Sequence, residues 1–147
     1  MYKRQISGKV FHLELAIEPD TRFKGLSGRT EIAADGGMLF VLPRPAKQEF
    51  VMRDCPIPID IIYLDGSGRI VAMHKMVPVE PPRQEDEKAL NRNGVNEKYE
   101  SRLKRYPSRF AAQLVIELKG DSLDTLKLKD GDKIRFEDLA ALKKLAK

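Results

Sequence analysis

The sequence predicts an α+β protein that is mainly antiparallel β-structure, arranged as a compact β-barrel or sandwich with a few short peripheral helices. Several short apolar runs are separated by turn residues, which is typical of strands joined by hairpins. The regular alternation of strands and helices that accompanies a parallel sheet does not occur. The 147 residues are the length of one ordinary domain, so we expect a single domain over residues 1–147.

The first half of the chain supplies two strands and a short helix. From Lys9 to Glu18 apolar and polar residues alternate, which indicates a half-buried strand. A short helix is predicted to begin at Pro19-Asp20, and Gly25 within it suggests that another backbone comes close. The run Met38–Leu42 is continuously apolar and is expected to form a buried strand.

The stretch from Phe50 to Asp65 joins the most apolar part of the chain to its most unusual polar residues. Its second half, Ile59–Leu64, is apolar on both faces of a strand, and Asp60 lies among the apolar residues of one face. A carboxylate in such surroundings needs a partner. We expect the partner to be backbone N–H groups, or Arg22 or Arg29, which the early helix would bring over the sheet.

The second half of the chain adds the hairpin partner of this strand and then a charged segment. An apolar return strand is predicted at 69–77, after the loop at 65–68. Residues 80–106 are dense in charge and poor in large aliphatic residues, so we expect a charged surface excursion with a piece of helix from about Glu97 to Arg105. Further predicted elements are strands at 110–118 and 133–136, a helical turn at 122–126 and a C-terminal helix at 138–147.

Composition and charge narrow the classes of function. The net charge of +5 and the pI of about 9.3 permit anion binding, and basic residues gather between Lys98 and Arg109. No nucleic-acid-binding motif accompanies them, so we favour a solvated basic surface. Neither a signal peptide nor a membrane-spanning segment is seen, and we expect a cytoplasmic protein.

No metal and no cofactor is predicted. His12 and His74 lie on separate predicted strands and form no ligand pair, and Cys55 is the only cysteine. We interpret His74 as a core histidine that binds a backbone carbonyl. The glycines punctuate turns, and no phosphate-binding loop pattern is present.

Four motifs in a fixed order resemble a known family. They are Arg22–Arg29, Gly37–Phe40, Phe50–Asp60, and Glu117-Leu118 followed by Gly131-Asp132. Together they resemble the family called domain of unknown function 192, over roughly residues 10 to 136. The resemblance implies a compact, mostly antiparallel β fold and a family without an established activity. The sequence departs from the family's pattern at Val51, where tryptophan is common, at Asp54-Cys55, which replaces an Asn-Thr pair, and in a longer excursion after Pro78.

The candidate binding site consists of Arg22, Arg29, Met52, Asp54 and Asp60, between the early helix and the following strands. An arginine fork suits a carboxylate or a phosphate, so the expected ligand is a small anion. Our leading hypothesis is a small single-domain ligand-binding or accessory protein. For Asp60 itself we favour the structural interpretation, as a carboxylate that accepts hydrogen bonds only within the fold.

Two alternatives remain open. Asp54 and Asp60 are candidates for the acid and base of a hydrolase-like enzyme, but two prolines separate them and no nucleophile has a base nearby in the sequence. The basic segment Lys98–Arg109 is a candidate surface for an anion or a nucleic acid, and binding there would weaken steeply with salt. The sequence favours binding over catalysis.

Overall fold

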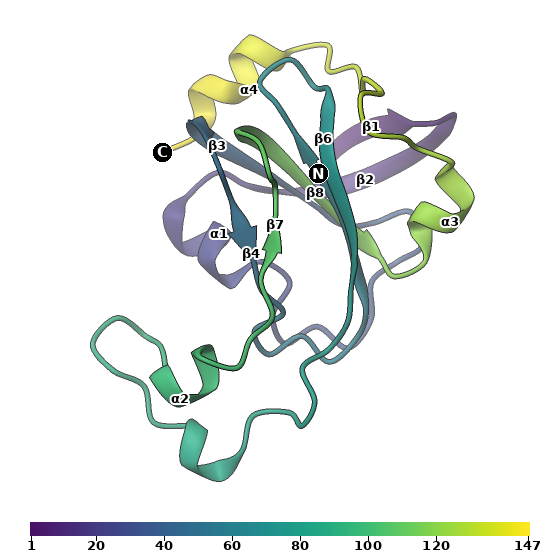
Figure 1. Ribbon diagram of the computed structural model, residues 1–147. Coiled ribbons are helices and arrows are strands. Elements are labelled where there is room, and N and C mark those ends of the chain that lie inside the picture. The colour runs from purple at the N-terminus through teal and green to yellow at the C-terminus, as the bar shows by residue number, and fades with distance from the viewer.

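Six strands form a central sheet in the spatial order β1 (Tyr2–Ile6), β2 (Lys9–Ala16), β3 (Met38–Ala46), β8 (Ala112–Lys119), β5 (Ile59–Leu64) and β6 (Ile70–Met76), as Figure 1 shows. The computed structural model describes residues 1–147. Neighbouring strands are antiparallel except β2 and β3, which are parallel. The predicted α+β class with mainly antiparallel strands is therefore confirmed.

The sheet does not close into a barrel, because β1 and β6 remain as its two edges. The ladder between β3 and β8 shifts register after Val41, and β3 leads into the small antiparallel ribbon of β4 (Glu49–Phe50) and β7 (Tyr106–Pro107). The molecule is one compact domain, and the barrel form of the prediction is wrong.

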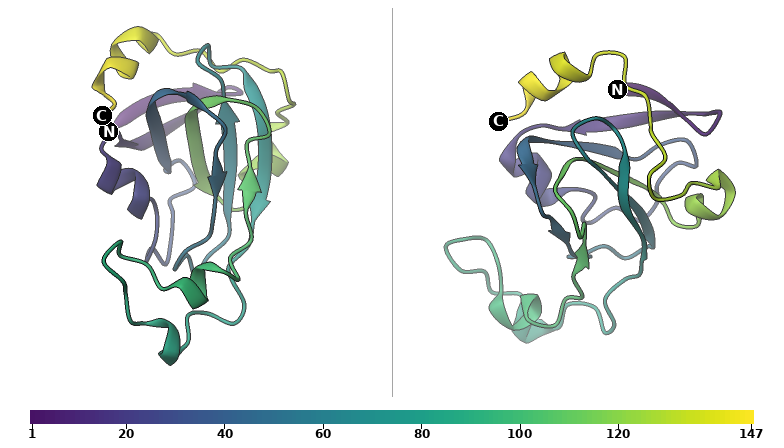
Figure 2. Two further views of the ribbon diagram at one scale, coloured as in Figure 1. Left: turned by 60° about the vertical axis from the view of Figure 1, so that its left-hand side comes forward. Right: turned by 45° about the horizontal axis from the view of Figure 1, so that its top comes forward.

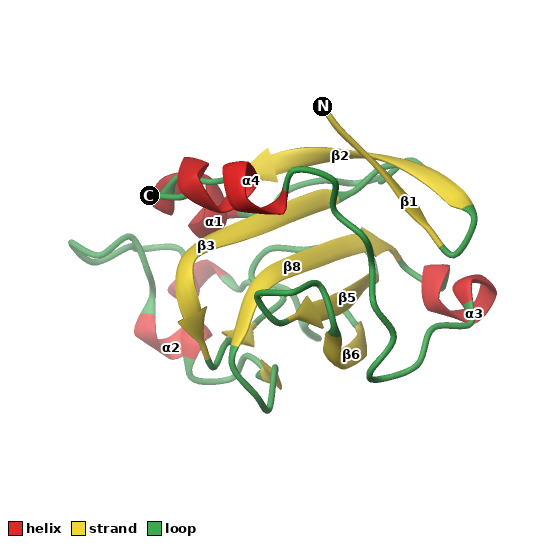
Figure 3. Cartoon of the chain, turned by 90° about the horizontal axis from the view of Figure 1, so that it is seen from above, coloured by secondary structure: helices red, strands yellow, loops and turns green.

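β5 and β8 lie in the middle of the sheet and separate two apolar cores. All of β5, and all of β8 except its last residue, is buried because both faces of these strands are covered. The helix-covered core is packed by α3 (Ser122–Leu126) and α4 (Leu139–Leu145), and Figure 3 shows α4 alongside β3. The cleft-side core lies on the opposite face, behind the ribbon and the loop that precedes β5. The helix-covered core includes Ile62, Leu64, Ile116, Leu118, Leu126 and Leu142, and the cleft-side core includes Leu26, Met38, Met52, Ile61, Tyr63 and Val115.

Most predicted elements are found with small shifts of their ends, including α1 (Pro19–Lys24), α3, α4 and the β5–β6 hairpin. The helix predicted from about Glu97 to Arg105 is shorter, because α2 ends at Glu100 (Glu97–Glu100). Residues 133–136 form one bridge to Arg69 instead of a strand. Here the segment passes over the β5–β6 hairpin loop, and the backbone N–H of Ile134 donates to the carbonyl of Gly68. A Cβ on Gly68 would lie 2.4 Å from the Ile134 carbonyl oxygen, so only glycine permits this crossing.

Residues 80–106 leave the sheet after β6 and extend from one end of the molecule before the chain returns through β7, as Figure 2 shows. We call this segment the excursion. It contains a 3₁₀ turn, η1 (Glu85–Glu87), and the helix α2. Tyr99 and Glu87 are almost completely buried within it. Across the whole chain, no helix is both long enough and apolar enough to cross a membrane.

Candidate functional site

A cleft of about 410 Å³ lies where the excursion meets the body of the sheet. Its walls are mainly apolar, from a methionine, a valine, a tyrosine and three prolines, and we call it the excursion cleft. Small-molecule sites typically occupy roughly 300 to 1,000 Å³ and have apolar walls with a few polar groups. The lining residues are Gly28, Met52, Asp54, Cys55, Pro56, Pro78, Val79, Glu80, Pro82, Arg83 and Tyr99.

One wall of the cleft is the loop that precedes β5, which is fastened to the segment after α1. The N–H of Gly28 donates to the carbonyl of Asp54 at 2.8 Å, and the hydroxyl of Ser27 donates to the carbonyl of Arg53 at 2.6 Å. Gly25 packs so closely against β3 that a Cβ there would lie 3.3 Å from an aromatic ring. The prediction that another backbone comes close at Gly25 is wrong, because the near neighbour is the side chain of Phe40.

The other wall is the excursion, which is tied to the loop through Asp54. The backbone N–H of Asp54 donates to the hydroxyl of Tyr99 at 3.0 Å. The Asp54 carboxylate accepts two hydrogen bonds from Arg83, at 2.9 and 2.8 Å. The Arg83 guanidinium also lies over the Tyr99 ring, 3.9 Å from its centroid. A second ion pair, between Arg53 and Glu100, joins the same two segments.

Of the five predicted site residues, the structure brings only Met52 and Asp54 together in this cleft. Arg22 donates from its guanidinium to three backbone carbonyls near the end of β2, in β3 and at the C-terminus. Arg29 forms a two-point ion pair with Glu14, at 2.7 and 2.9 Å. Both guanidinium groups are therefore occupied within the fold.

Asp60 is buried as predicted, and its partner is a backbone N–H, not an arginine. Its side chain is 1% exposed and accepts a hydrogen bond from the backbone N–H of Leu123 at 2.8 Å. Burial raises the pKa of Asp60, and hydrogen bonds from the N–H groups of Leu123 and Asp121 partly offset this rise. The predicted ion pair with Arg22 or Arg29 is wrong, because the alternation of the strand points Asp60 toward α3.

Asp54 and Asp60 lie on opposite sides of the sheet. Met52, close to Asp54 in the cleft, belongs to the cleft-side core. Leu126, in the helix that Asp60 contacts, belongs to the helix-covered core. The two carboxylates do not form the acid–base couple of the hydrolase hypothesis.

Glu117 is the buried acid on the cleft side of the sheet, and the sequence reasoning did not select it as a site residue. It is 5% exposed and stands in β8 between Met38 of β3 and Ile61 of β5. No hydrogen bond or ion pair from the protein offsets the burial, which raises the pKa of its carboxyl to about 8. A signal was present, since Glu117 interrupts an apolar run just as Asp60 interrupts β5.

Cys55 is another residue that lines the excursion cleft. Burial, with the charge of Glu117 as the next cause, raises the pKa of the Cys55 thiol to about 11. The thiol lies 3.4 Å from the carbonyl oxygen of Arg53. A cysteine that stays protonated at neutral pH is poorly suited to act as a nucleophile.

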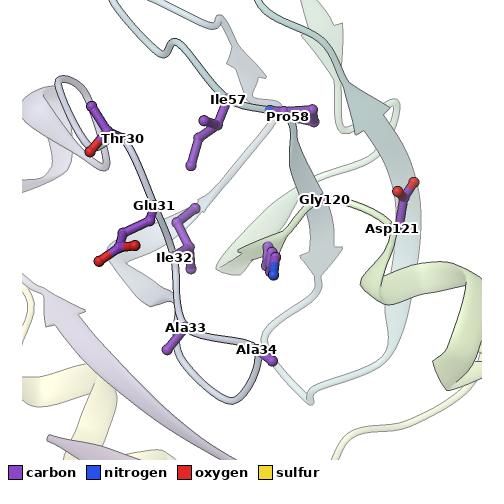
Figure 4. Close-up of a pocket in the computed structure, with 10 residues that line it drawn as sticks. Thr30, Glu31, Ile32, Ala33, Ala34, Ile57, Pro58, Gly120 and Asp121 are labelled. Atoms are coloured by element: carbon purple, nitrogen blue, oxygen red, sulfur yellow. The ribbon is translucent and has the colours of Figure 1, made fainter.

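A second groove, of about 580 Å³, adjoins the other end of the same loop. Figure 4 shows the Thr30–Ala34 segment facing Pro58 and Gly120 across it. Lys119, which also lines this groove, follows Glu117 by two residues on the same face of β8. The lining residues are Thr30, Glu31, Ile32, Ala33, Ala34, Ile57, Pro58, Lys119, Gly120 and Asp121.

The basic residues of the excursion are partly neutralised within the protein. Lys98 pairs with Asp86, and Arg102 binds the buried carboxylate of Glu87 at 2.7 Å. The Arg102 guanidinium also donates to two proline carbonyls of the excursion. These cations hold the excursion together, which weakens the hypothesis that the segment is a nucleic-acid-binding surface.

The histidines do not form a metal site, and no three His, Cys, Asp or Glu side chains lie together in a way that could hold a metal ion. A ring nitrogen of His74 is 2.7 Å from the carbonyl oxygen of Pro107. The ring also packs edge-on against Tyr63 and Tyr106. This contact confirms the interpretation of His74 as a histidine bound to a backbone carbonyl.

Comparisons with known proteins agree with this fold. The family DUF192, described as Uncharacterized ACR, matches residues 2–136. A protein of unknown function from Novosphingobium aromaticivorans DSM 12444 is 27% identical, with a TM-score of 0.68 over 91% of this chain and 81% of that chain. A candidate transcription regulator from Sinorhizobium meliloti 1021 is 24% identical, with a TM-score of 0.66 over 90% of this chain and 88% of that chain. No curated protein matches the sequence significantly.

Proposed function

The chain belongs to the domain of unknown function 192 family, and we propose that it is a binding protein that holds a small organic ligand in the excursion cleft. The observation that carries this proposal is a cleft of about 410 Å³ with apolar walls and one ion pair, Asp54 with Arg83, at its edge. Met52 and Asp54 of the predicted site belong to it. An accessory role, in which the ligand is held for another protein, is compatible with the same site.

Binding is a better account of this cleft than hydrolysis. Asp54 is engaged by Arg83, and Asp60 faces the opposite side of the sheet. The raised pKa of Cys55 removes the remaining nucleophile candidate in the cleft. Catalysis would need an activated group, and these three side chains offer none.

The small anionic ligand expected from the sequence is less favoured by the charges of the cleft. Arg22 and Arg29 are bound elsewhere in the fold. Arg83 is the only cation that lines the cleft, and its guanidinium already binds Asp54 and the carbonyl of Glu87. An anion entering the cleft would have to compete for a donor that is already used.

A fragment screen by two-dimensional ¹H–¹⁵N NMR tests the proposal. We expect small neutral and charged fragments with an apolar body to shift the amide signals of Cys55, Val79, Arg83 and Tyr99, which line the cleft. Val79→Trp should fill the cleft and abolish these shifts. Val77→Trp is the matched control, because Val77 is 58% exposed and does not line the cleft. Fragments that shift signals elsewhere, or that still bind to Val79→Trp, would show that the cleft is not the site.

A further inference from the structure

A further groove, of about 650 Å³, runs along the free edge of β1. Its other side is the chain between α3 and α4, which passes β1 in Figure 1. Residues 4–6 point alternately to the two faces of the strand, yet all three line the groove, so the groove follows the edge of β1. We call it the edge groove. The lining residues are Arg4, Gln5, Ile6, Ser7, Gly8, Leu128, Asp132, Lys133, Ile134, Arg135 and Glu137.

β1 leaves backbone groups unpaired at this groove. Ser7 and Gly8, both with positive φ, form the two-residue turn between β1 and β2, and Ile6 stands opposite Lys9. The pair that closes such a turn exchanges two backbone hydrogen bonds, and hydrogen-bonded pairs alternate along an antiparallel ladder. The N–H and C=O of Gln5 therefore point away from β2, toward the free edge, where they have no backbone partner.

The opposite side of the groove also leaves backbone groups unpaired. Lys133 forms an antiparallel bridge with Arg69, and the backbone hydrogen bonds of this bridge are made by the two chain neighbours of Lys133. The N–H and C=O of Lys133 itself thus point away from the hairpin loop. The carbonyl of Arg135 accepts a hydrogen bond from Arg4 Nη1 at 2.9 Å, so this side of the segment faces β1. The N–H groups of Lys133 and Arg135 donate to no backbone carbonyl.

Arg4 spans the gap between the two backbone edges with its side chain, where adjacent strands would use backbone hydrogen bonds. Its guanidinium lies 5.4 Å from the ring centroid of Tyr2 and 5.7 Å from that of Phe136. Arg4 Nε is the only side-chain nitrogen or oxygen that is both completely enclosed and without a hydrogen-bond partner. The protein therefore holds this guanidinium in place at the groove without using all of its donors.

The positive charge of the edge groove is not neutralised by ion pairs. Arg4, Lys133 and Arg135 take part in none of the ion pairs of the protein. Two acids, Asp132 and Glu137, line the same groove, so three cations stand against two acids. The excess of positive charge favours an acidic partner.

We propose that the edge groove binds an extended acidic peptide of a partner protein, which adds to β1 as a further strand. This inference goes beyond the ligand binding proposed for the excursion cleft and is independent of it. The peptide backbone pairs with Gln5 on one side and with Lys133 and Arg135 on the other, while its acidic side chains lie near the three cations. A small inorganic anion would use the cations alone and would leave both rows of backbone groups unpaired.

Three probes of the full chain test the proposal: acetyl-(Glu-Val)₃-amide, acetyl-(Lys-Val)₃-amide and inorganic tripolyphosphate. In ¹H–¹⁵N NMR titrations, the glutamate peptide should shift the amide signals of Gln5, Lys133 and Arg135 and slow their hydrogen exchange. The lysine peptide should bind at least about fivefold more weakly. A glutamate peptide that is N-methylated at alternate residues keeps its charge but cannot pair with one of the edges, and it should bind at least about tenfold more weakly.

Two outcomes with these probes would overturn the proposal. Equal binding of the glutamate and lysine peptides would exclude an acidic partner. Tripolyphosphate that shifts the same signals, while no peptide slows the exchange of these amides, would identify a simple anion site. Neither outcome bears on the excursion cleft, which the fragment screen tests separately.

Two pairs of variants localise the binding. Gln5→Pro removes an N–H that faces the free edge, and Lys3→Pro is its matched control, because Lys3 does not line the groove. Lys133→Glu reverses a lining charge, and its control is Lys129→Glu, an exposed lysine of the same segment that does not line the groove. The first variant of each pair should weaken binding of the glutamate peptide at least about fivefold, and each control less than about twofold. If Gln5→Pro does not fold, the lysine pair decides. Equal affinities within that pair would refute the inference.

Discussion

Asp60 and Glu117 are two buried acids in neighbouring strands, and they have opposite surroundings. Asp60 of β5 stands opposite Leu118 of β8, and Glu117 stands opposite Ile61, so the acids occupy adjacent rungs of one ladder. The strand period points Asp60 to the helix-covered core and Glu117 to the cleft-side core. Asp60 meets the N–H of Leu123, whereas Glu117 meets no polar group of the protein.

The contrast shows that burial alone does not make an acid a candidate site. What matters is whether the protein itself supplies a hydrogen-bond partner for the buried carboxyl. Asp60 fastens α3 to the sheet, and its hydrogen bonds explain its position without a ligand. Glu117 brings no comparable stabilisation to the fold. Its burial costs free energy, and a residue of this kind is a better candidate for binding.

The largest expected effect is on the pH dependence of stability. The folded protein holds a proton on Glu117 up to about pH 8, whereas the ordinary pKa of this group is 4.5. The folded state therefore binds more protons than the unfolded chain between these values, and stability falls as the pH rises through this window. The expected slope is roughly 1 kcal/mol per pH unit.

Urea denaturation of the wild type and of Glu117→Gln, from about pH 5 to about pH 8, measures this slope. The variant should lose most of the pH dependence, because glutamine carries no titrating proton. Asp60→Asn should retain most of it, since hydrogen bonds to Asp60 offset part of the pKa rise of that acid. Equal slopes in the wild type and Glu117→Gln would show that Glu117 titrates normally, and the contrast between the two acids would be lost.

The next effect concerns Asp60. Asp60→Ala leaves the backbone N–H of Leu123 without its acceptor, in a partly buried position. We expect the free energy of unfolding to fall by about 2 kcal/mol at neutral pH. Asp124→Ala removes an exposed acid of α3 that pairs with Lys75 and should change stability by less than about 0.5 kcal/mol. If the two variants are equally stable, the fastening role of Asp60 is wrong.

The sequence was sufficient to predict the strand that contains Asp60 and its burial, because alternation along a strand is a local property. It was also sufficient to predict the β5–β6 hairpin and the short helices around the sheet. The same criterion, an acid inside an apolar strand, would have identified Glu117.

The hydrogen-bond and ion-pair partners of the site residues could not be predicted from the sequence, because they depend on contacts between segments that are distant in the chain. Arg29 binds Glu14, and the acceptor Asp60 binds an N–H that lies 63 residues further along the chain. The excursion cleft exists only because Tyr99 and Arg83 return to Asp54, 45 and 29 residues away. No local period or spacing encodes such pairings. The predicted site therefore contained two residues of the cleft and three that act elsewhere.

The smallest expected effect is on the reactivity of Cys55. It distinguishes Glu117 from Asp60, because the two acids point to opposite faces of the sheet. The negative charge of Glu117 contributes to the raised pKa of the thiol, after burial. Near pH 9, where Glu117 is ionised, Glu117→Gln removes this charge and should increase the thiolate fraction. We expect alkylation by iodoacetamide to become about two to three times faster, corresponding to a small fall in the thiol pKa.

Asp60→Asn should leave the alkylation rate unchanged, because Asp60 acts on the other side of the sheet. Rates measured for both variants in concentrated urea should equal that of the wild type, which controls for the intrinsic reactivity of the thiol. The modest size of the effect follows from burial, which is the larger cause of the pKa rise and persists in both variants. Equal acceleration in Asp60→Asn would mean that loosening of the fold, and not the charge of a neighbour, governs access to Cys55.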